Sequence, residues 1–436
     1  MPSFPSLPAF RAAALLALGL SAAPLQAATW WIVNSTADAP DRDTANGVCD
    51  AEVGGQVVCT LRAAVMQAAA GDVVQLAAGA TYTLTRPRFA AEPDAWGGDL
   101  DIQVATLTIQ GPVLGARPTI RADDGFNDRL IRVEGWNKLI LRRAVLDGAD
   151  NENGGALAGG YGYMDLVDVR IQGSGADSGG AIWANAAVSL TRCEFVGNHA
   201  RIGGAISFNS SSNGPLMADT VSFIDNRADE RGGAFYIAGN STANLTNATF
   251  HGNGAPDGAA LASQVVFPSW VTLNNATITG NGGLGGATQS AIVLGGVIYP
   301  ANSVIAGNDA AADIRLDGGS NVLSSGHNVL GTIDYDPANN IVTLDATDRP
   351  APAYLGLLPP SIAPWSTVGI TTLVPAADSP LRDTGHPGSG GNTECAPVDA
   401  NGVARGAMQP CDVGAAEYLP SADVLFADGF DVPSAR

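Results

Sequence analysis

Short runs of alternating apolar and polar residues recur through the middle of the chain. The segments "VSLTRCEF", "ANLTNATF" and "VTLNNATI" alternate at a period of two on either side of a two-residue break. In the last segment, Asn274 and Asn275 form the break, and the expected inward positions are Val271, Leu273, Ala276 and Ile278. This alternation predicts thin strands joined by short turns, and it excludes helical repeats, whose apolar positions follow a longer period.

A short sequence motif recurs at a fixed spacing along the chain. An asparagine closes each unit, and successive asparagines lie 27 or 28 residues apart, at Asn198, Asn226, Asn253, Asn281 and Asn308. Three positions earlier stands an apolar residue: Phe195, Phe223, Phe250, Ile278 or Ile305. Such a period indicates stacked units that bury their apolar faces against one another. The expected fold is all-β, a right-handed, single-stranded parallel β-helix of the pectate-lyase-like kind.

Stacking at this period places residues of successive units in columns. One column contains Arg192, Thr220, Asn247, Asn275 and Asn302. Asparagine tolerates left-handed backbone, and stacked asparagine side chains can hydrogen-bond along the axis of a solenoid. We therefore expect the asparagines of this column to form a hydrogen-bonded ladder at a turn. We expect Asn198 to be a turn-ladder residue as well.

Two further columns follow from the same alignment. Cys193 shares an inward column with Val221, Ala248, Ala276 and Ser303, which predicts a buried, structural thiol. Asp177, Arg201 and Glu230 each stand four residues before a repeat alanine. They are expected to form a column of alternating charge that contributes little stability.

The first residues have the pattern of a secretory signal. One arginine precedes an apolar run and then small residues, with cleavage expected near Ala27 or Ala28. The mature chain has no second apolar stretch of membrane-spanning length, so we expect a protein secreted or held at the outer cell surface. The expected organisation is a signal peptide at 1–28, an N-terminal cap at 29–75, the β-helix at 76–335, a C-terminal region at 336–420 and a tail at 421–436.

The sequence predicts a helix at one end of the repeat region and a disulfide near each end. Residues 59–72 place Leu61, Ala64, Val65 and Ala68 on one helical face, which predicts an amphipathic helix covering the open end of the solenoid. An exported protein forms disulfides, and the cysteines near each end are close in sequence. The expected pairs are Cys49 with Cys59 and Cys395 with Cys411.

Three segments resemble modules of secreted bacterial proteins. The C-T-L-R-A-A phrase at 59–64 resembles the core of the CSLREA domain, with two of its positions replaced. The FxxN and GGAI phrases of the repeats resemble those of polymorphic outer-membrane proteins, which implies a right-handed parallel β-helix. Segments near the C-terminus resemble the choice-of-anchor Q module, whose pattern is met by Asp383, Asp399, Arg405, Asp412 and Glu417. These resemblances imply architecture and export, but they imply no particular activity.

Charge narrows the choice of partners. A net charge of −20 excludes nucleic acid as a partner, because phosphate binding needs clustered lysine and arginine. An acidic surface fits either solubility or Ca²⁺ binding. The candidate acidic site consists of Asp147, Asp150 and Glu152, with Asp165 and Asp168 on the following unit. Ca²⁺ is the cofactor that Asp147, Asp150 and Glu152 could hold, and the alternative interpretation is a solvated turn.

The exposed faces of a β-helix offer a repetitive surface for glycans or other cell-surface partners. Aromatic residues around the acidic cluster, namely Trp136, Tyr161, Tyr163 and Trp183, could stack on sugar rings. We therefore expect a monomeric binding, adhesin-like or structural protein. Two alternatives stay open: a polysaccharide lyase or glycoside hydrolase that uses Asp147 to Asp168, and a passenger of an outer-membrane secretion system.

Overall fold

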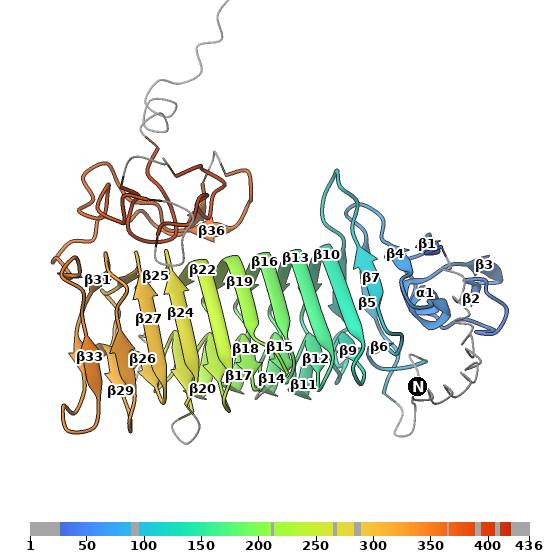
Figure 1. Ribbon diagram of the computed structural model, residues 1–436. Coiled ribbons are helices and arrows are strands. Elements are labelled where there is room, and N and C mark those ends of the chain that lie inside the picture. The colour runs from blue at the N-terminus through green and yellow to red at the C-terminus, as the bar shows by residue number, and fades with distance from the viewer. Residues whose placement is uncertain are drawn as a thin grey trace, which may run out of the picture.

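The chain folds into a parallel β-helix whose stacked coils place their strands in parallel sheets (Figure 1). The computed structural model describes residues 27–88, 96–210, 213–264, 268–282, 289–363, 366–388, 394–405 and 410–419. Nearly all of the predicted signal peptide and the whole predicted tail at 421–436 lie outside these residues. The all-β solenoid expected from the period-two alternation is confirmed.

Three parallel sheets form the solenoid. The long sheet contains β1 (Trp30–Ile32), β4 (Val73–Gln75), β5 (Thr81–Leu84), β7 (Leu107–Gln110), β8 (Thr119–Ala122), β10 (Lys138–Asp147), β13 (Tyr163–Gln172), β16 (Val188–Val196), β19 (Leu216–Ile224), β22 (Thr242–His251), β24 (Trp270–Asn274), β25 (Thr277–Ile278), β27 (Val297–Ala301), β28 (Val304–Ile305), β30 (Asn321–Leu323), β31 (Val329–Leu330), β33 (Ile341–Thr343) and β34 (Arg349–Pro350). The short-strand sheet contains β6 (Leu100–Ile102), β9 (Ile131–Val133), β12 (Leu157–Gly159), β15 (Ile182–Ala184), β18 (Ile206–Phe208), β21 (Phe235–Ile237), β23 (Leu261–Ser263), β26 (Ser290–Leu294), β29 (Ala312–Leu316) and β32 (Ile333–Asp334). The four-stranded sheet contains β11 (Asp150–Asn153), β14 (Gly175–Ser178), β17 (His199–Ile202) and β20 (Arg227–Arg231).

A sharp corner divides each rung of the long sheet into two halves. The corner residues have positive φ, between 49° and 62°, and form one column: Arg143, Asp168, Arg192, Thr220, Asn247, Asn275, Asn302 and His327. The predicted alignment of Arg192 and Thr220 with the asparagines is confirmed by the strand register. Asparagine suits this column because its short polar side chain tolerates the left-handed region.

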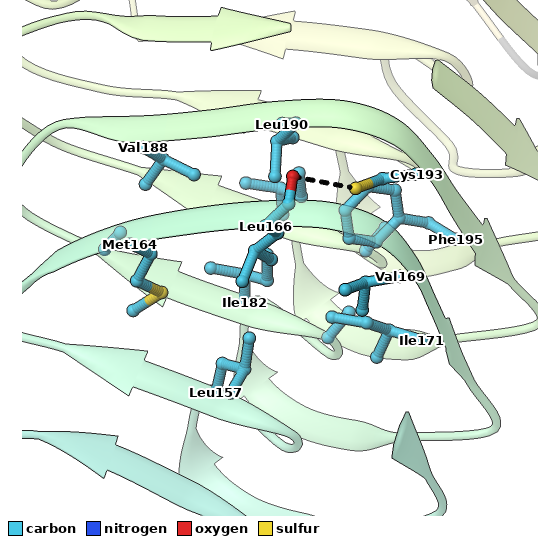
Figure 2. Close-up of a cluster of buried hydrophobic side chains, with 14 of the residues drawn as sticks. Leu157, Met164, Leu166, Val169, Ile171, Ile182, Val188, Leu190, Cys193 and Phe195 are labelled. Atoms are coloured by element: carbon cyan, nitrogen blue, oxygen red, sulfur yellow. Dashed lines mark hydrogen bonds between the residues drawn. The ribbon is translucent and has the colours of Figure 1, made fainter. Parts of the chain in front are cut away.

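Inward side chains stack in columns that form the core. The rings of Phe195 and Phe223 stack with centroids 5.0 Å apart, and those of Phe223 and Phe250 with centroids 4.5 Å apart. Cys193 is completely buried beside them, and its thiol donates to the carbonyl of Leu166 (Figure 2). Burial raises the pKa of this thiol to about 12, so it stays protonated. The prediction of a structural thiol is confirmed.

The asparagines that close the repeats form the hydrogen-bonded ladder of the solenoid. Four of them are fully buried, namely Asn198, Asn226, Asn253 and Asn281, and Asn308 is half-buried. The Oδ1 atom of Asn226 accepts from the backbone N of Asn198 at 3.0 Å and from its Nδ2 at 2.9 Å. The same pattern joins Asn226 to Asn253, Asn253 to Asn281, and Asn281 to Asn308. The ladder expected at Asn198 is therefore confirmed, whereas among the described residues the one expected at Asn247, Asn275 and Asn302 is not formed.

The double glycine at Gly203 and Gly204 permits a close approach between coils. A Cβ on Gly204 would overlap the carbonyl oxygens of Gly233 and Arg227 on the next coil. Because the four-stranded and short-strand sheets meet at this point, any side chain would force adjacent coils apart.

An N-terminal cap covers one end of the solenoid (Figure 1). It contains α1 (Leu61–Gln67), the hairpin of β2 (Ala51–Val53) and β3 (Gln56–Val58), and the predicted disulfide between Cys49 and Cys59. The Arg62 side chain is fully buried; its Nε lies 2.6 Å from Asp38 Oδ1, and its Nη2 donates to the carbonyl of Gly98 at 2.8 Å. The arginine of the CSLREA-like phrase thus ties α1 to the first coils.

The C-terminal region folds back over the second halves of the long-sheet rungs (Figure 1). It contains β35 (Ser361–Ile362), β36 (Thr371–Thr372) and the predicted disulfide between Cys395 and Cys411. The corner asparagines bind this region: Asn247 Nδ2 donates to the carbonyl of Val398 at 2.9 Å, and Asn302 Oδ1 accepts from the backbone N of His386 at 2.8 Å. These contacts explain why the corner asparagines do not form a ladder with one another.

Candidate functional site

The predicted acidic residues do not converge on one point. Asp165 and Asp168 lie on β13, while Asp147 lies at the end of β10, where its rung partner is Gln172. Asp168 accepts from Arg192 Nε at 2.6 Å and from Arg192 Nη2 at 3.0 Å. Asp165 Oδ2 lies 3.7 Å from Lys138 Nζ. Each carboxylate therefore has a different neighbour, and two of them are already paired with a cation.

A shallow hollow of about 290 Å³ brings Asp147 and Asp150 together with two acidic residues that the sequence analysis missed, Asp123 and Asp124. Arg121 lies in the same hollow. Asp123 and Asp124 follow β8 on the preceding coil. Aligning successive coils would therefore have placed them next to Asp147 and Asp150. The side chain of Glu152 lies outside the described part of the chain.

Whether this region can bind Ca²⁺ depends on how many oxygen ligands it brings together. Calcium takes six to eight oxygen ligands at short range. Within the described residues, no group of three or more His, Cys, Asp or Glu side chains is arranged to hold a metal ion. The Ca²⁺ site at Asp147, Asp150 and Glu152 stays a prediction, and no step of a mechanism is assigned to it.

A second acidic group that the sequence analysis missed lies on the first coils of the solenoid. Asp99 immediately precedes β6 and Asp101 lies within it, and both are almost completely buried. Burial, together with the neighbouring Asp101 and Asp128, raises the pKa of Asp99 to about 7. Burial, together with Glu134, raises the pKa of Asp101 to about 6. Asp99 Oδ2 lies 3.2 Å from Arg129 Nε.

Three aromatic side chains cluster on the outside of the solenoid. The rings of Trp136 and Tyr161 stack with centroids 5.1 Å apart and an interplanar angle of 22°, and Tyr163 lies 6.3 Å from Trp136. Trp136 is 61% exposed and Tyr161 is 54% exposed. Trp183 is half-buried on β15, where its rung partners are Ala158 and Ser207. The structure thus brings together three of the four aromatic residues considered from the sequence.

These aromatic residues lie at what we call the turn edge, formed by the turns that lead from the short-strand sheet into the long sheet. The turns comprise residues 134–137, 160–162, 185–187, 209–210, 213–215 and 238–241. Hydrogen bonds connect neighbouring coils here: Tyr163 N, at the start of β13, donates to the carbonyl of Asn137 at 2.9 Å, and Ala187 N donates to the carbonyl of Asn213 at 3.1 Å. The turn edge is therefore a continuous feature along the axis.

Beside the turn edge, the outward side chains of the first long-sheet halves are mostly polar and uncharged. On β16 to β27 they include Ser189, Thr191, Asn244, Thr246, Thr272 and Tyr299. Asp219 is the charged exception between β16 and β22. Hydroxyl and amide groups can donate or accept hydrogen bonds without a fixed charge, which suits an uncharged ligand.

The charged surface lies on the four-stranded sheet instead. Arg201 Nε donates to Asp177 Oδ1 at 2.7 Å, and Arg201 Nη1 donates to Glu230 Oε2 at 2.9 Å. The predicted column of alternating charge is confirmed. All three side chains are exposed, so the pairing is screened by solvent and contributes little stability.

Comparison with known proteins shows no family for this chain. No protein-family model matches it, and no curated protein matches it. Among solved structures, the crystal structure of pectate lyase Pel9A is similar, with 13% sequence identity and a TM-score of 0.40, covering 90% of this chain and 97% of that one. The resemblances to CSLREA and choice-of-anchor Q modules stay predictions.

Proposed function

We propose that this chain is a secreted or cell-surface protein that binds polysaccharide along the turn edge. The observation that carries the proposal is the exposed stack of Trp136 on Tyr161. Leaving two large rings in water forgoes the free energy that their burial would provide, at roughly 25 cal/mol per Å². Sugar rings have apolar faces that pack on aromatic side chains, while their hydroxyls need hydrogen-bonding partners.

Export is supported by the two disulfides. Disulfides persist in oxidising compartments and are rare in the cytosol. Within the described residues, no helix is long and apolar enough to cross a membrane.

The geometry gives less support to a lyase or hydrolase at Asp147 to Asp168. Glycoside hydrolysis needs two carboxyl groups on either side of one bond, at a defined separation. Asp168 is held by Arg192, and Asp147 has Gln172 as its hydrogen-bonding neighbour, with Gln172 Nε2 donating to Asp147 Oδ1 at 3.1 Å. Asp147 and Asp168 therefore have separate partners, which gives no support to their acting as a catalytic pair.

The proposal is tested by measuring the affinity of the full chain for a panel of soluble neutral and acidic polysaccharides by calorimetry. Trp136→Ala and Tyr161→Ala are each expected to lower the affinity about fivefold, since stacking on one ring contributes on the order of 1 kcal/mol. Tyr335→Ala is the matched control, because Tyr335 is also exposed but lies on another part of the solenoid. Unchanged affinity in both turn-edge variants would contradict the proposal.

The same samples distinguish binding from cleavage. Reducing ends and unsaturated products are measured after long incubation with each polysaccharide. Release of products by the wild type, abolished by Asp147→Asn and Asp168→Asn, would favour the enzymatic alternative.

A further inference from the structure

The turn edge contains a polar hollow of about 330 Å³ between the β18–β19 loop and the β21–β22 turn. We call it the polar hollow and define it by Ser210, Pro215, Asn240, Ser241, Thr242 and Asn244. None of its described lining residues is charged. Its volume is within the range of pockets that hold small ligands.

Two buried serines make the floor of the polar hollow rigid. The backbone N of Ser210 donates to Ser241 Oγ at 2.9 Å, and Ser241 Oγ donates to the carbonyl of Ala238 at 2.6 Å. Ser210 is 2% exposed and Ser241 is 1% exposed. Hydrogen bonds fixed before a ligand arrives reduce the entropy lost on binding.

The walls of the polar hollow carry groups that are available to a ligand. Asn240 is exposed, and Thr242 and Asn244 are half-buried. Among the described residues, the Asn244 amide has a contact to Met217 Sδ at 3.2 Å, a weak acceptor. An amide presents two donors and one acceptor, so these side chains can satisfy several sugar hydroxyls at once.

An exposed aromatic ring stands next to the polar hollow. Trp270 is the rung partner of Thr242, and its backbone N donates to the carbonyl of Ser241 at 3.0 Å. Trp270 is 38% exposed. The polar groups of the hollow therefore have an apolar surface on the adjacent coil.

The polar hollow lies on the same column as the aromatic stack. The strand register continues from Tyr163 through Ala187, Pro215 and Thr242 to Trp270. Four coils separate Tyr163 from Trp270, on the order of 20 Å at the spacing of adjacent strands. An oligosaccharide that follows the axis would reach both ends of this column.

We propose that the polar hollow is a subsite for one residue of a neutral polysaccharide, with Asn240 and Asn244 binding its hydroxyls and Trp270 packing on its ring. The inference rests on the proposed function, because the same ligand would continue to the Trp136–Tyr161 stack. An anionic chain is disfavoured, since the described lining residues include no cationic side chain and the protein has a net charge of −20, so the ligand's charge would not be compensated.

The test compares a neutral galactomannan and a neutral xyloglucan with polygalacturonate, using calorimetry on the full chain. The double variant Asn240→Ala/Asn244→Ala is expected to lower affinity for at least one neutral polymer about tenfold, because it removes the hydrogen bonds of both amides to the ligand. Asn127→Ala is the matched control, since Asn127 is an exposed asparagine lining a different hollow. Thermal unfolding verifies that each variant is folded, and Asn240→Asp serves as a second, size-conserving variant.

The outcomes separate the subsite from the proposed function. Loss of affinity in the double variant, with Asn127→Ala unchanged, supports the subsite. If Trp136→Ala weakens binding but the double variant and Asn240→Asp do not, the subsite is overturned while the function stands. Wild-type binding to polygalacturonate alone also overturns the subsite, and no binding to any polymer overturns both.

Discussion

Burial controls the charge of Asp99 and Asp101 more strongly than their cationic neighbours do. The Oδ1 atom of Asp101 is buried and has no hydrogen-bond partner among the described residues. Arg132 faces it on the next rung. Glu134, Asp128 and Arg129 are the other charged groups that act on it. A carboxylate in such a position is costly to ionise, so the folded state favours the protonated form.

Because ionising Asp101 is costly in the folded state, the effect of Asp101→Asn on the free energy of unfolding should depend on pH. The pKa of Asp101 is raised from 3.8 to about 6, so its contribution to stability is fully present below pH 3.8 and is lost as pH rises through about 6. The variant should therefore be more stable than the wild type at pH 8, by about 3 kcal/mol, and the difference should shrink toward pH 5. Thermal unfolding at both pH values measures this. A difference that does not vary with pH would contradict the explanation.

At the scale of the element, the buried asparagine ladder holds one coil to the next. Asn226 Oδ1 accepts twice from Asn198, and Asn226 Nδ2 donates to the carbonyl of Phe195 at 2.9 Å. The ladder ends where Asn308 Nδ2 donates to Asp313 Oδ1 at 2.8 Å. Because these groups are buried, each needs its partner in the ladder.

Removing one rung should therefore destabilise the solenoid strongly. Asn226→Ala leaves the Asn198 amide and the Phe195 carbonyl without their partner, at an expected cost of about 3 kcal/mol in the free energy of unfolding. Asn244→Ala, on the outward face of β22, is the control and should cost less than 1 kcal/mol. Denaturant unfolding measures both. Similar losses in the two variants would show that the ladder has no special role.

At the scale of the whole molecule, the C-terminal region packs against the solenoid through buried polar contacts. Arg405 has a fully buried side chain whose Nη1 donates to Asn247 Oδ1 at 2.8 Å and whose Nε lies 2.6 Å from Glu417 Oε1. The buried Glu194 accepts from the backbone N of Thr371 at 2.8 Å. Residues that fit the choice-of-anchor Q pattern thus hold this region together and attach it to the solenoid.

Replacing Arg405 should loosen that attachment. Arg405→Met removes the hydrogen bond to Asn247 and leaves Glu417 buried without its cation, which costs roughly 3 kcal/mol or more. Limited proteolysis is expected to cut residues 351–419 first, leaving the solenoid intact. Arg201→Met is the control, since its exposed ion pairs contribute little. Equal protease resistance in the two variants would contradict this account.

Much of the solenoid was predictable because its signals are local or periodic. Alternation of period two indicated strands, the spacing of Asn198 and Asn226 gave the coil length, and the nearness of Cys49 to Cys59 predicted a disulfide. The candidate site was predicted less well. The positions of Trp136 and Tyr161 on neighbouring coils were enough to predict that they lie close together. Asp165 and Asp168 were predicted to share a site with Asp147, but each of the three carboxylates has a different partner in the structure.

The sequence by itself determined the repeating unit, because each coil presents the same inward apolar residues and the same buried asparagine to the next coil. Only the tertiary structure decided what each outward side chain meets. Asn247 and Arg405 are 158 residues apart, and no periodic pattern relates them. Likewise, the high pKa of Asp99 depends on burial by neighbouring coils and on Asp128, which local sequence does not encode. Contacts between stacked coils recur along the chain. Contacts between the C-terminal region and the solenoid, onto which it folds back, occur only once.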